Sequence, residues 1–464
     1  MTPQPRRHRP RRPAWLAVPM DLAPLRQSRQ FRLLWSSRTV TLLGTQVSEV
    51  ALLVQARQLT GSAIMVGWLG AAEVAPLIVF GLYGGVLADR VDRRRLALAT
   101  EAGLGLISLL LAGNALAVRP LVWPLYVCAA VSMALVAVQR PSLDAAVPRL
   151  LTAGQLTAGS ALLSLGSNAG AIIGPAIGGF LAAGPGPAAA YALDAASFAV
   201  SLALLGFLKP LPPRRTWQRP ANAAERTSGT PGTADPGTAE TRTAAPGSGD
   251  LGAGSGTVLA EIVAGLRYAR HRRDLVRSYL ADLAAMLLAY PNSLLPFLAV
   301  ILHAGWAVGL MFSAQAAGAV AASLTSRWTS RVRRFGLAIV LSAAAWGAAT
   351  AGLGLAPGLG PALVFLAVGG AADMLSGTFR DTLWNRTVPD AVRGRLAGVE
   401  LLSYGLGPSA GQIRAGAVAS VTGTRTALWS GGLSCVAALG LLCLAIPPAV
   451  TRRSAAGPVS RARE

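Results

Sequence analysis

Apolar runs of about 20 residues recur along the whole chain and constrain its fold more than any other feature. Each run is long enough to cross the hydrocarbon core of a bilayer. Such spans are helical, because hydrocarbon offers backbone groups no hydrogen-bonding partner and a helix satisfies its own. The runs lie at 37–59, 64–87, 96–117, 121–138, 157–183, 187–208, 275–302, 308–326, 335–355, 359–380, 396–421 and 425–447. The sequence therefore predicts an all-α membrane protein with twelve transmembrane helices.

The composition agrees with this prediction and argues against a catalytic or metal centre. Hydrophobic residues make up 53% of the chain and charged residues 13%, whereas soluble domains are about a quarter charged. Cys128, Cys435 and Cys443 fall inside predicted spans, where we expect them to pack as small groups. Neither cysteine nor histidine spacing fits a metal site or a disulfide framework. We expect no metal, no cofactor and no enzymatic activity, and the basic N-terminus does not resemble a removable signal peptide.

The net charge of +22 is distributed unevenly between the two sides of the predicted membrane. Arginines crowd the N-terminal tail and the turns that follow spans 2, 4, 6, 8 and 10, whereas the opposite turns hold only Arg119 and Arg425. Positive residues are retained on the cytoplasmic side of membrane proteins. This asymmetry predicts a multi-pass protein of the cell inner membrane with both termini in the cytoplasm. The charge then reflects topology and contact with anionic lipid rather than nucleic-acid binding.

A polar stretch near the middle divides the chain into two halves. Its Pro, Gly, Thr, Ala and Ser residues cannot bury a core, which is typical of a flexible linker. The apolar spacing of 257–275 indicates an amphipathic helix on the inner membrane surface. The predicted organisation is a basic tail (1–30), an N-terminal six-helix half (31–208), a cytoplasmic linker (209–256), a C-terminal half led by the amphipathic helix (257–450) and a second cytoplasmic tail (451–464).

The two halves repeat each other weakly but in register. Residues 140–164 resemble 380–403, so that Arg140 matches Arg380. A second alignment sets Glu73 against Gln315. Two six-span repeats are the architecture of transporters that rock one half against the other around a midplane site. We therefore expect two pseudo-symmetric halves with a binding site between them.

A charged loop between spans 2 and 3 reads GGVLADRVDRRR (84–95). It resembles the G-x-L-A-D-R-x-G-R-R signature of the major facilitator superfamily, with Asp92 where the family usually has glycine. The matching residues of the gating motif are Gly85, Asp89, Arg90, Arg93 and Arg94. The resemblance implies that Asp89 joins a cytoplasmic charge network that latches the inner gate in the outward-open state. The alternative, that these charges only fix topology, explains the arginines but not the aspartate.

Span 5 contains GAIIGPAIGG (170–179), which resembles the sequence that marks the antiporter branches of the superfamily. Pro175 removes a backbone donor and kinks a helix, and the glycines allow close helix packing. The motif residues are Gly170, Gly174, Pro175, Gly178 and Gly179. The resemblance associates this motif with sealing the transport path against leak, and helix packing alone is the alternative.

Further segments resemble the multidrug and siderophore-exporting subfamily of the superfamily, which includes the enterobactin exporter. They are FRLLWSSR (31–38), RQLTGSA (57–63) and PDAVRGRLAG (389–398). The second-half loop of this pattern contains Arg380, Pro389, Arg393 and Arg395. The resemblance covers the whole chain apart from its tails and linker, and it implies the major facilitator fold.

Acidic residues inside the predicted spans are candidates for proton coupling, because each costs roughly 2.5–3.5 kcal/mol at a helix centre. The deepest are Glu49, Glu73, Asp282 and Asp373. Glu73 is the first choice, because its repeat partner Gln315 could serve a purely structural hydrogen bond equally well. Glu101 and Asp194 lie nearer predicted helix ends, or form ion pairs there, and they rank lower. Arg414 is expected to snorkel outward or to counter an acid. For any one acid, a buried structural hydrogen bond or ion pair is the alternative.

Together these features predict a secondary active transporter. We expect a monomer that exports a hydrophobic or amphipathic small molecule, such as a drug, siderophore or secondary metabolite, in exchange for protons. The sequence contains no Walker-type loop that would bind ATP. One alternative is a proton-coupled importer, against which the span 5 motif counts. Another is a membrane ligand sensor or scaffold that does not transport, which a flux assay in liposomes would distinguish.

Overall fold

The computed structural model describes residues 21–144, 146–210, 273–387 and 390–445. The side chains of 81–90, 141, 153, 273–274, 327, 330, 385 and 390–405 are not among those described. Most of the predicted linker and of the predicted amphipathic helix falls outside these ranges, and so do both predicted tails for most of their length.

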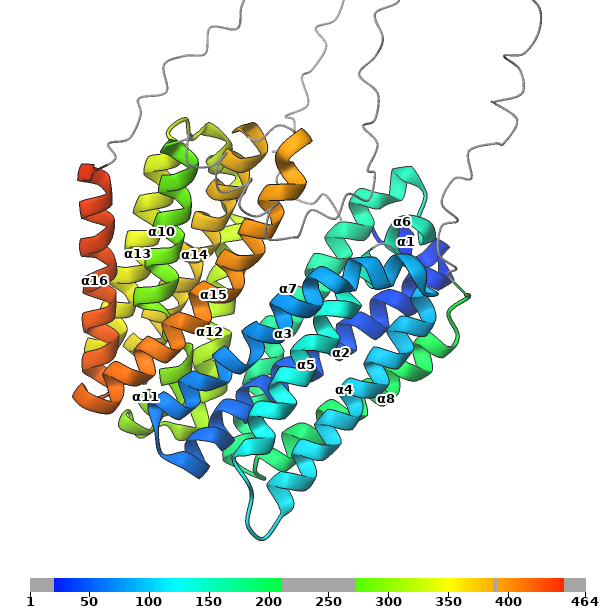
Figure 1. The fold of residues 1–464 in the computed structure, drawn as a ribbon, viewed down its shortest axis with the longest axis horizontal. Coiled ribbons are helices and arrows are strands. Elements are labelled where there is room, and N and C mark those ends of the chain that lie inside the picture. The colour runs from blue at the N-terminus through cyan, green and yellow to red at the C-terminus, as the bar shows by residue number, and fades with distance from the viewer. Residues whose placement is uncertain (1–20, 145, 211–272, 388–389, 446–464) are drawn as a thin grey trace, which may run out of the picture.

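The N-terminal half is built from six long helices joined by short turns and short helices (Figure 1). The long helices are α2 (Arg29–Thr60), α3 (Ala63–Arg90), α4 (Arg93–Leu116), α5 (Trp123–Asp144), α7 (Leu156–Ala183) and α8 (Pro187–Gly206). The short elements are α1 (Ala23–Gln27), α6 (Val147–Leu150) and the 3-10 turn η1 (Ala153–Gln155). Helix α2 begins eight residues before the predicted span, because the Ser28 hydroxyl caps it by accepting from the backbone N–H of Phe31 at 3.1 Å.

The C-terminal half has the same plan, with one broken helix. Its elements are α10 (Arg273–Ala289), η4 (Asn292–Leu294), α11 (Leu295–Ile301), η5 (Gly305–Ala307), α12 (Val308–Leu324), η6 (Ser326–Arg331), α13 (Phe335–Leu355), α14 (Leu359–Thr387), α15 (Asp390–Thr422) and α16 (Thr424–Ala445). The sequence predicted one continuous span at 275–302, and the structure divides it into α10, η4 and α11. Pro291 explains the break, because it lacks a backbone N–H and disfavours helical geometry at Tyr290.

The predicted set of membrane spans is reproduced closely. Eleven segments in the described residues are long and apolar enough to cross a membrane. Helix α15 is the twelfth long segment, and its 33 residues correspond to about 50 Å. The predicted fold class, an all-α membrane protein with twelve spans in two halves, is therefore confirmed.

The pairing of helices shows the pseudo-symmetry of the two halves. In the first half, α2 packs against α7 and α8, α3 against α5, and α4 against α8. In the second half, α10 packs against α15 and α16, α12 against α14, and α13 against α16. Each pair in one half has its counterpart in the other, which is the arrangement expected of an internal repeat.

The two halves converge at one end of the molecule and diverge at the other (Figure 1). We call the first the closed end, which holds the turns at Gly61, Gly186 and Gly423, and the second the open end, where α2 begins and α8 finishes. At the closed end α3 packs against α15, and α7 against α12. Glycines bring these backbones together, since a Cβ on Gly67 would meet the backbone of Gln412.

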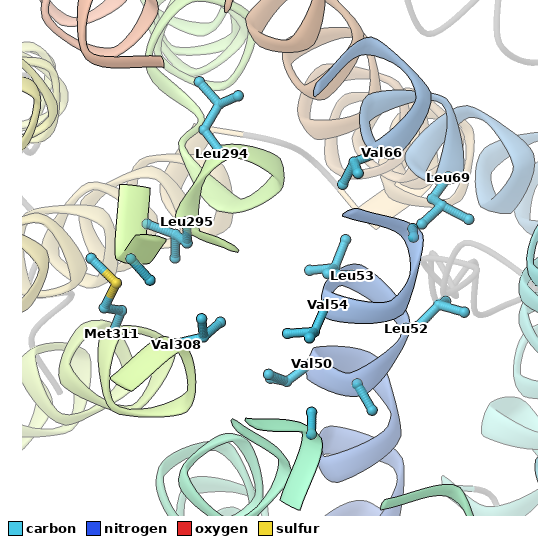
Figure 2. Close-up of a cluster of buried hydrophobic side chains, with 14 of the residues drawn as sticks. Val50, Leu52, Leu53, Val54, Val66, Leu69, Leu294, Leu295, Val308 and Met311 are labelled. Atoms are coloured by element: carbon cyan, nitrogen blue, oxygen red, sulfur yellow. The ribbon is translucent and has the colours of Figure 1, made fainter. Parts of the chain in front are cut away.

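An apolar cluster fills the space between the halves near the closed end. Val50, Leu53 and Val54 of α2 point toward the side on which Leu295 and Val308 of the other half lie (Figure 2). All five side chains are buried. The cluster also includes Leu294 and Met311. It blocks passage from the closed end into the interior of the molecule.

Candidate functional site

A cavity of about 370 Å³ lies inside the N-terminal half. Residues from α2, α3, α4, α5, α7 and α8 line it, so every long helix of that half contributes. Four carboxylates lie on its wall, those of Glu49, Glu73, Glu101 and Asp194. These are the four acids that the sequence places inside the first six spans. The structure therefore brings together residues that are up to 145 positions apart in the chain.

A second pocket, of about 190 Å³, lies between the two halves. Glu49 of α2 and Asp373 of α14 line it from opposite halves, and Gln315 of α12 lies on its wall. Gln46 and Glu49 also line the larger cavity, so the two spaces meet at these side chains. Glu49 thus faces both the interior of the first half and the seam between the halves.

Tyr290 is a further residue of this seam, and the sequence analysis did not identify it. Its hydroxyl interacts electrostatically with Glu49, Glu73 and Asp373, and Glu73 interacts with Glu49 in the same way. Tyr290 stands at the break after α10, directly before Pro291. The signal that could have identified Tyr290 is its position next to a proline inside a predicted span. Proline interrupts a span, and interrupted spans mark binding sites in transporters.

Glu101 and Asp194 are held by hydroxyl groups on the cavity wall. The hydroxyls of Ser48 and Ser108 each donate to Asp194 at 2.7 Å, and the Thr41 hydroxyl lies 3.2 Å from Glu101. Both carboxylates are almost fully buried. Their partners are neutral donors rather than the cation of an end-of-helix pair, so both belong to the polar wall of the cavity.

The C-terminal half contains a buried ion pair between Asp282 of α10 and Arg380 of α14. Both side chains are less than 10% exposed. Asp373 interacts electrostatically with both members of the pair. The sequence assigned Asp282 to proton coupling and Arg380 to a loop motif, and it did not indicate that they meet. Arg140, the repeat partner of Arg380, is exposed and lines the larger cavity instead.

The prediction for Arg414 is wrong, because its guanidinium points to a broken helix end inside its own half and forms no ion pair with an acid of the described residues. It donates to the backbone carbonyls of Leu287 and Leu288 at 2.8 and 2.6 Å. The indole of Trp346 and the hydroxyl of Thr350 donate to the next carbonyl, that of Ala289. The break after α10 leaves these carbonyls without helical partners. Three side chains from two other helices, α13 and α15, therefore satisfy the broken end.

The charged gating loop connects α3 to α4 at the open end. Gly85, Asp89 and Arg90 belong to α3, and their side chains lie outside those described. Asp92 caps α4, because its carboxylate accepts from the backbone N–H groups of Arg94 and Arg95 at 2.9 and 3.1 Å. Its φ of −58° requires no glycine, which explains how this chain accommodates its departure from the family signature.

Two arginines of the same loop are described. The Arg94 guanidinium donates to the carbonyls of Leu205 and Gly206 at the end of α8, and Arg93 is buried. The loop is thereby tied to its own half in this conformation. The predicted second-half loop residues Pro389, Arg393 and Arg395 lie outside the described side chains.

The glycines of the span 5 motif make close helix contacts. Cβ atoms on Gly174 and Gly178 would press on α2, one on Gly170 would touch α2 at ordinary contact distance, and one on Gly179 would meet the backbone of Gly309 on α12. Helix α7 continues through Pro175 to Ala183. The hydroxyl of Ser313 on α12 also donates to the carbonyl of Ile172 at 2.5 Å. The motif therefore joins the first half to the second near the closed end.

Comparison with known proteins agrees with this architecture. Residues 20–220 match the transmembrane secretion effector family, MFS_3. The enterobactin exporter EntS of Shigella flexneri is 27% identical over 454 residues, which cover 94% of this chain and 98% of that protein. EntS of Citrobacter koseri is 27% identical over 391 residues, 84% of each chain. The chain is a secondary transporter that is similar in sequence and in fold to members of the major facilitator superfamily. A variant of the peptide transporter POT shares the fold of this transporter, with a TM-score of 0.66 at 14% identity over 90% of this chain and 94% of that one.

The transporter is a multi-pass membrane protein that moves a small molecule and is not an enzyme. Its geometry fits alternating access, in which one end opens while the other is sealed. The cavity lies on the open side of the apolar cluster that includes Val50, Leu53 and Val308. Transport requires this cluster and the glycine contacts at the closed end to separate.

Proposed function

We propose that the transporter exports a hydrophobic or amphipathic small molecule, of the size class of a siderophore or drug, in exchange for protons. It acts as a monomer in the cell inner membrane, with both termini and the linker at 209–256 in the cytoplasm. Two relatives that align with most of the chain are named as enterobactin exporters, which supports the direction of transport and the substrate class.

The proposed proton coupling rests on one observation, which is that carboxylates from both halves lie where the halves meet. Glu49 and Asp373 line one pocket from opposite sides, and Glu73 interacts with Glu49. Ionisable groups inside a membrane are costly and mark ion pathways. A carboxylate at the seam is exposed to one side of the membrane in each conformation, as a proton carrier must be.

The basic turns support a cytoplasmic position for the open end. Arg94, Arg140 and Arg149 all lie at or near that end, and cytoplasmic loops carry an excess of arginine. In the conformation described, the cavity of about 370 Å³ then accepts substrate from the cytoplasm. The opposite conformation releases it outside, which is the direction of export.

The gating loop has a proposed role in that opposite conformation. The halves are apart at the open end here (Figure 1), so a latch across this end is not engaged. Asp89, together with Arg90, Arg93 and Arg94, would hold the open end shut when the closed end opens. The span 5 motif around Pro175 has the complementary proposed role of limiting leak at the closed end.

Glu73 remains the first candidate for the proton carrier, followed by Glu49 and Asp373. It lines the cavity and interacts with a second carboxylate. Substrate and proton can therefore compete for the same charge or space. Asp282 ranks behind these three because its ion pair with Arg380 already satisfies its charge.

Gradient-driven flux of the Glu73→Gln variant tests the proposal. Proteoliposomes that are acidic inside should accumulate added enterobactin or rhodamine 123 in exchange for protons. The variant should still bind these probes and exchange them without a gradient, but it should not concentrate them. The matched change Glu240→Gln, in the proposed linker, should leave gradient-driven accumulation at the level of the unchanged protein.

The result that contradicts this assignment is equally specific. If Glu73→Gln protein concentrates a probe in response to the pH gradient, Glu73 does not carry the proton. The same experiment on Glu49→Gln and Asp373→Asn then locates the carrier. If the unchanged protein accumulates no probe with any gradient, the proposed exporter function is wrong.

A further inference from the structure

We propose that the open end of the C-terminal half binds a phosphate group at the start of α13, where the buried guanidinium of Arg277 faces the first turn of that helix. The expected source of the phosphate is an anionic phospholipid of the surrounding membrane. Arg277 belongs to α10, which packs beside α13 (Figure 1). The site is separate from both pockets described above, and it does not depend on which substrate is exported.

Arg277 is a buried cation without a counter-ion in the described part of the chain. The residue is 2% exposed, and its Nε and Nη2 atoms donate to no acceptor. It takes part in neither of the two ion pairs that the described residues form. Asp282, the acid that the structure describes on the same helix, is already paired with Arg380. A buried charge without a partner is costly, so an anion that reaches this guanidinium would stabilise the protein.

The guanidinium faces the second residue of α13. A Cβ built on Gly336 would have the Nη1, Cζ and Nη2 atoms of Arg277 as its nearest neighbours, at 3.7, 3.8 and 3.9 Å. The Cα of Gly336 is therefore no more than about 5 Å from Nη1. An oxygen that accepts two N–H groups at about 2.9 Å each can bridge donors about 6 Å apart. One phosphate group can thus contact both the guanidinium and the backbone of this turn.

The first turn of α13 offers backbone donors and no capping acceptor. The N-cap residue is Arg334, whose side chain can only donate hydrogen bonds. The first backbone N–H to reach a carbonyl of the helix is that of Ala338, which donates to Arg334 at 3.0 Å. Phosphate binds at such termini because free N–H groups and the positive end of the helix dipole meet there. The same dipole disfavours a lone cation, so an anion between Arg277 and the helix would relieve their repulsion.

Further arginines lie on the outer side of the same turn. The Arg386 guanidinium, in the last turn of α14, lies 4.7 Å from the centroid of the Phe335 ring. Arg333 and Arg334 are exposed directly before the helix. The first turn itself contains no acidic residue. Positive charge therefore surrounds the turn on its outer and its buried side, which would guide an anion to Arg277.

The surroundings of the turn favour a phospholipid over a free phosphate ion. Leu341 of α13 is exposed, and so are Leu324 and Trp328, which lie in and after the last turn of α12. Tryptophan is enriched where acyl chains meet headgroups. A lipid whose headgroup lies at the start of α13 would cover these apolar side chains with its acyl chains. Exposed arginines attract any anionic lipid, whereas a buried guanidinium beside a helix terminus recognises the phosphate group itself.

Native mass spectrometry of the full chain, stripped of lipid in detergent, measures this binding. Didecanoyl phosphatidylglycerol is the anionic probe. Didecanoyl phosphatidylcholine has the same phosphodiester, but a cation in its headgroup cancels the charge. The first phosphatidylglycerol molecule should bind about tenfold or more tightly than the first phosphatidylcholine, and Arg277→Met should weaken phosphatidylglycerol binding by about tenfold or more, because charge-assisted hydrogen bonds are lost.

Gly336→Ala tests the position of the phosphate without removing a charge. The added methyl group would touch Arg277 at ordinary contact distance, so the fold accepts it, but it takes the place of a phosphate oxygen. It should weaken binding of phosphatidylglycerol as Arg277→Met does. Gly360→Ala is the matched control, because Gly360 is also the second residue of a helix and a Cβ there meets nothing within 4 Å. Arg119→Met removes an exposed arginine at the closed end and should also leave binding unchanged.

Thermal unfolding provides a second readout that a merely structural arginine would not give. Without lipid, Arg277→Met should unfold at a higher temperature than the unchanged protein, because it removes a buried charge that has no partner. Phosphatidylglycerol should raise the midpoint of the unchanged protein, since a ligand of the folded state stabilises it. It should not raise the midpoint of Arg277→Met.

Four results would overturn the inference. They are full affinity for phosphatidylglycerol in both Arg277→Met and Gly336→Ala, equal binding of the two lipids, no binding of phosphatidylglycerol or inorganic phosphate to the unchanged protein, and a lower midpoint for Arg277→Met without lipid. Inorganic phosphate distinguishes the source. If it raises the midpoint of the unchanged protein as phosphatidylglycerol does, and that of neither variant, the phosphate site stands and its ligand is a soluble phosphate.

Discussion

Replacing Gly67 by alanine should shift the transporter away from the described conformation. Gly67 lies on α3 at the closed end, where an added Cβ would be 2.5 Å from the carbonyl oxygen of Gln412 on α15. Ordinary contacts of a Cβ lie at 3.4–4 Å. Because the obstructing atom is backbone, it cannot rotate away, and the two helices must separate by about 1 Å to admit the methyl group.

The size of the effect follows from this contact. Overpacking of a close interface costs about 1–3 kcal/mol. This cost arises only while α3 and α15 are in contact. The opposite conformation, in which these two helices have separated, is free of it. A differential cost of this size changes the ratio of the two conformations by roughly 5- to 150-fold. The population should therefore move toward the outward-open state.

Distances between spin labels at the closed end measure this shift. Val118 and Val421 are exposed there on opposite halves, and both can be changed to labelled cysteine in a background without native cysteines. Gly67→Ala should increase the population with a long distance. Gly113→Ala, on α4, is the control, because an added Cβ there meets nothing within 4 Å. An identical distance distribution for Gly67→Ala and the unchanged protein would refute this reasoning.

Three further changes test other parts of the structure. Arg414→Leu removes the donors to the carbonyls of Leu287 and Leu288 and should lower the free energy of unfolding by roughly 1–3 kcal/mol. The midpoint of thermal unfolding should fall, and an unchanged midpoint would contradict the capping role. Arg380→Ala removes the ion-pair partner of the buried Asp282 carboxylate and should destabilise by roughly 3–5 kcal/mol. Arg380→Met combined with Asp282→Leu should unfold at a higher temperature than the single variant. Asp89→Asn should favour the inward-open state by up to roughly a hundredfold and reduce transport; unchanged transport and unchanged label distances at the open end would leave Asp89 without a latch role.

The membrane spans were predictable because bilayer thickness imposes one length on every helix. The break inside 275–302 was missed because hydropathy averages over the whole run, although Pro291 was visible in the sequence. The early start of α2 was missed because hydropathy locates only the part of a helix that lies in the membrane. Capping groups such as the Ser28 hydroxyl decide where the helix begins.

The acidic residues of the site could be found from the sequence, because an acid inside a membrane span costs free energy. That these residues line one cavity could not be predicted. Helices that are apolar on every side carry little sequence information about which face points inward. The shared cavity of Glu49, Glu73, Glu101 and Asp194 therefore required the structure. Interactions between distant helices were hidden in the same way, which is why the pairing of Asp282 with Arg380 and the capping by Arg414 were not foreseen.

Proton movement during substrate transport tests the proposed coupling most directly. Proteoliposomes with a pH-sensitive dye in the lumen, at equal pH on both sides, report protons as enterobactin or rhodamine 123 is added outside. We predict that the lumen becomes more alkaline as the probe enters, because each substrate molecule that enters is exchanged for protons that leave, and that Glu73→Gln abolishes this change. Entry of the probe with no change in lumen pH, or with acidification, would contradict proton antiport.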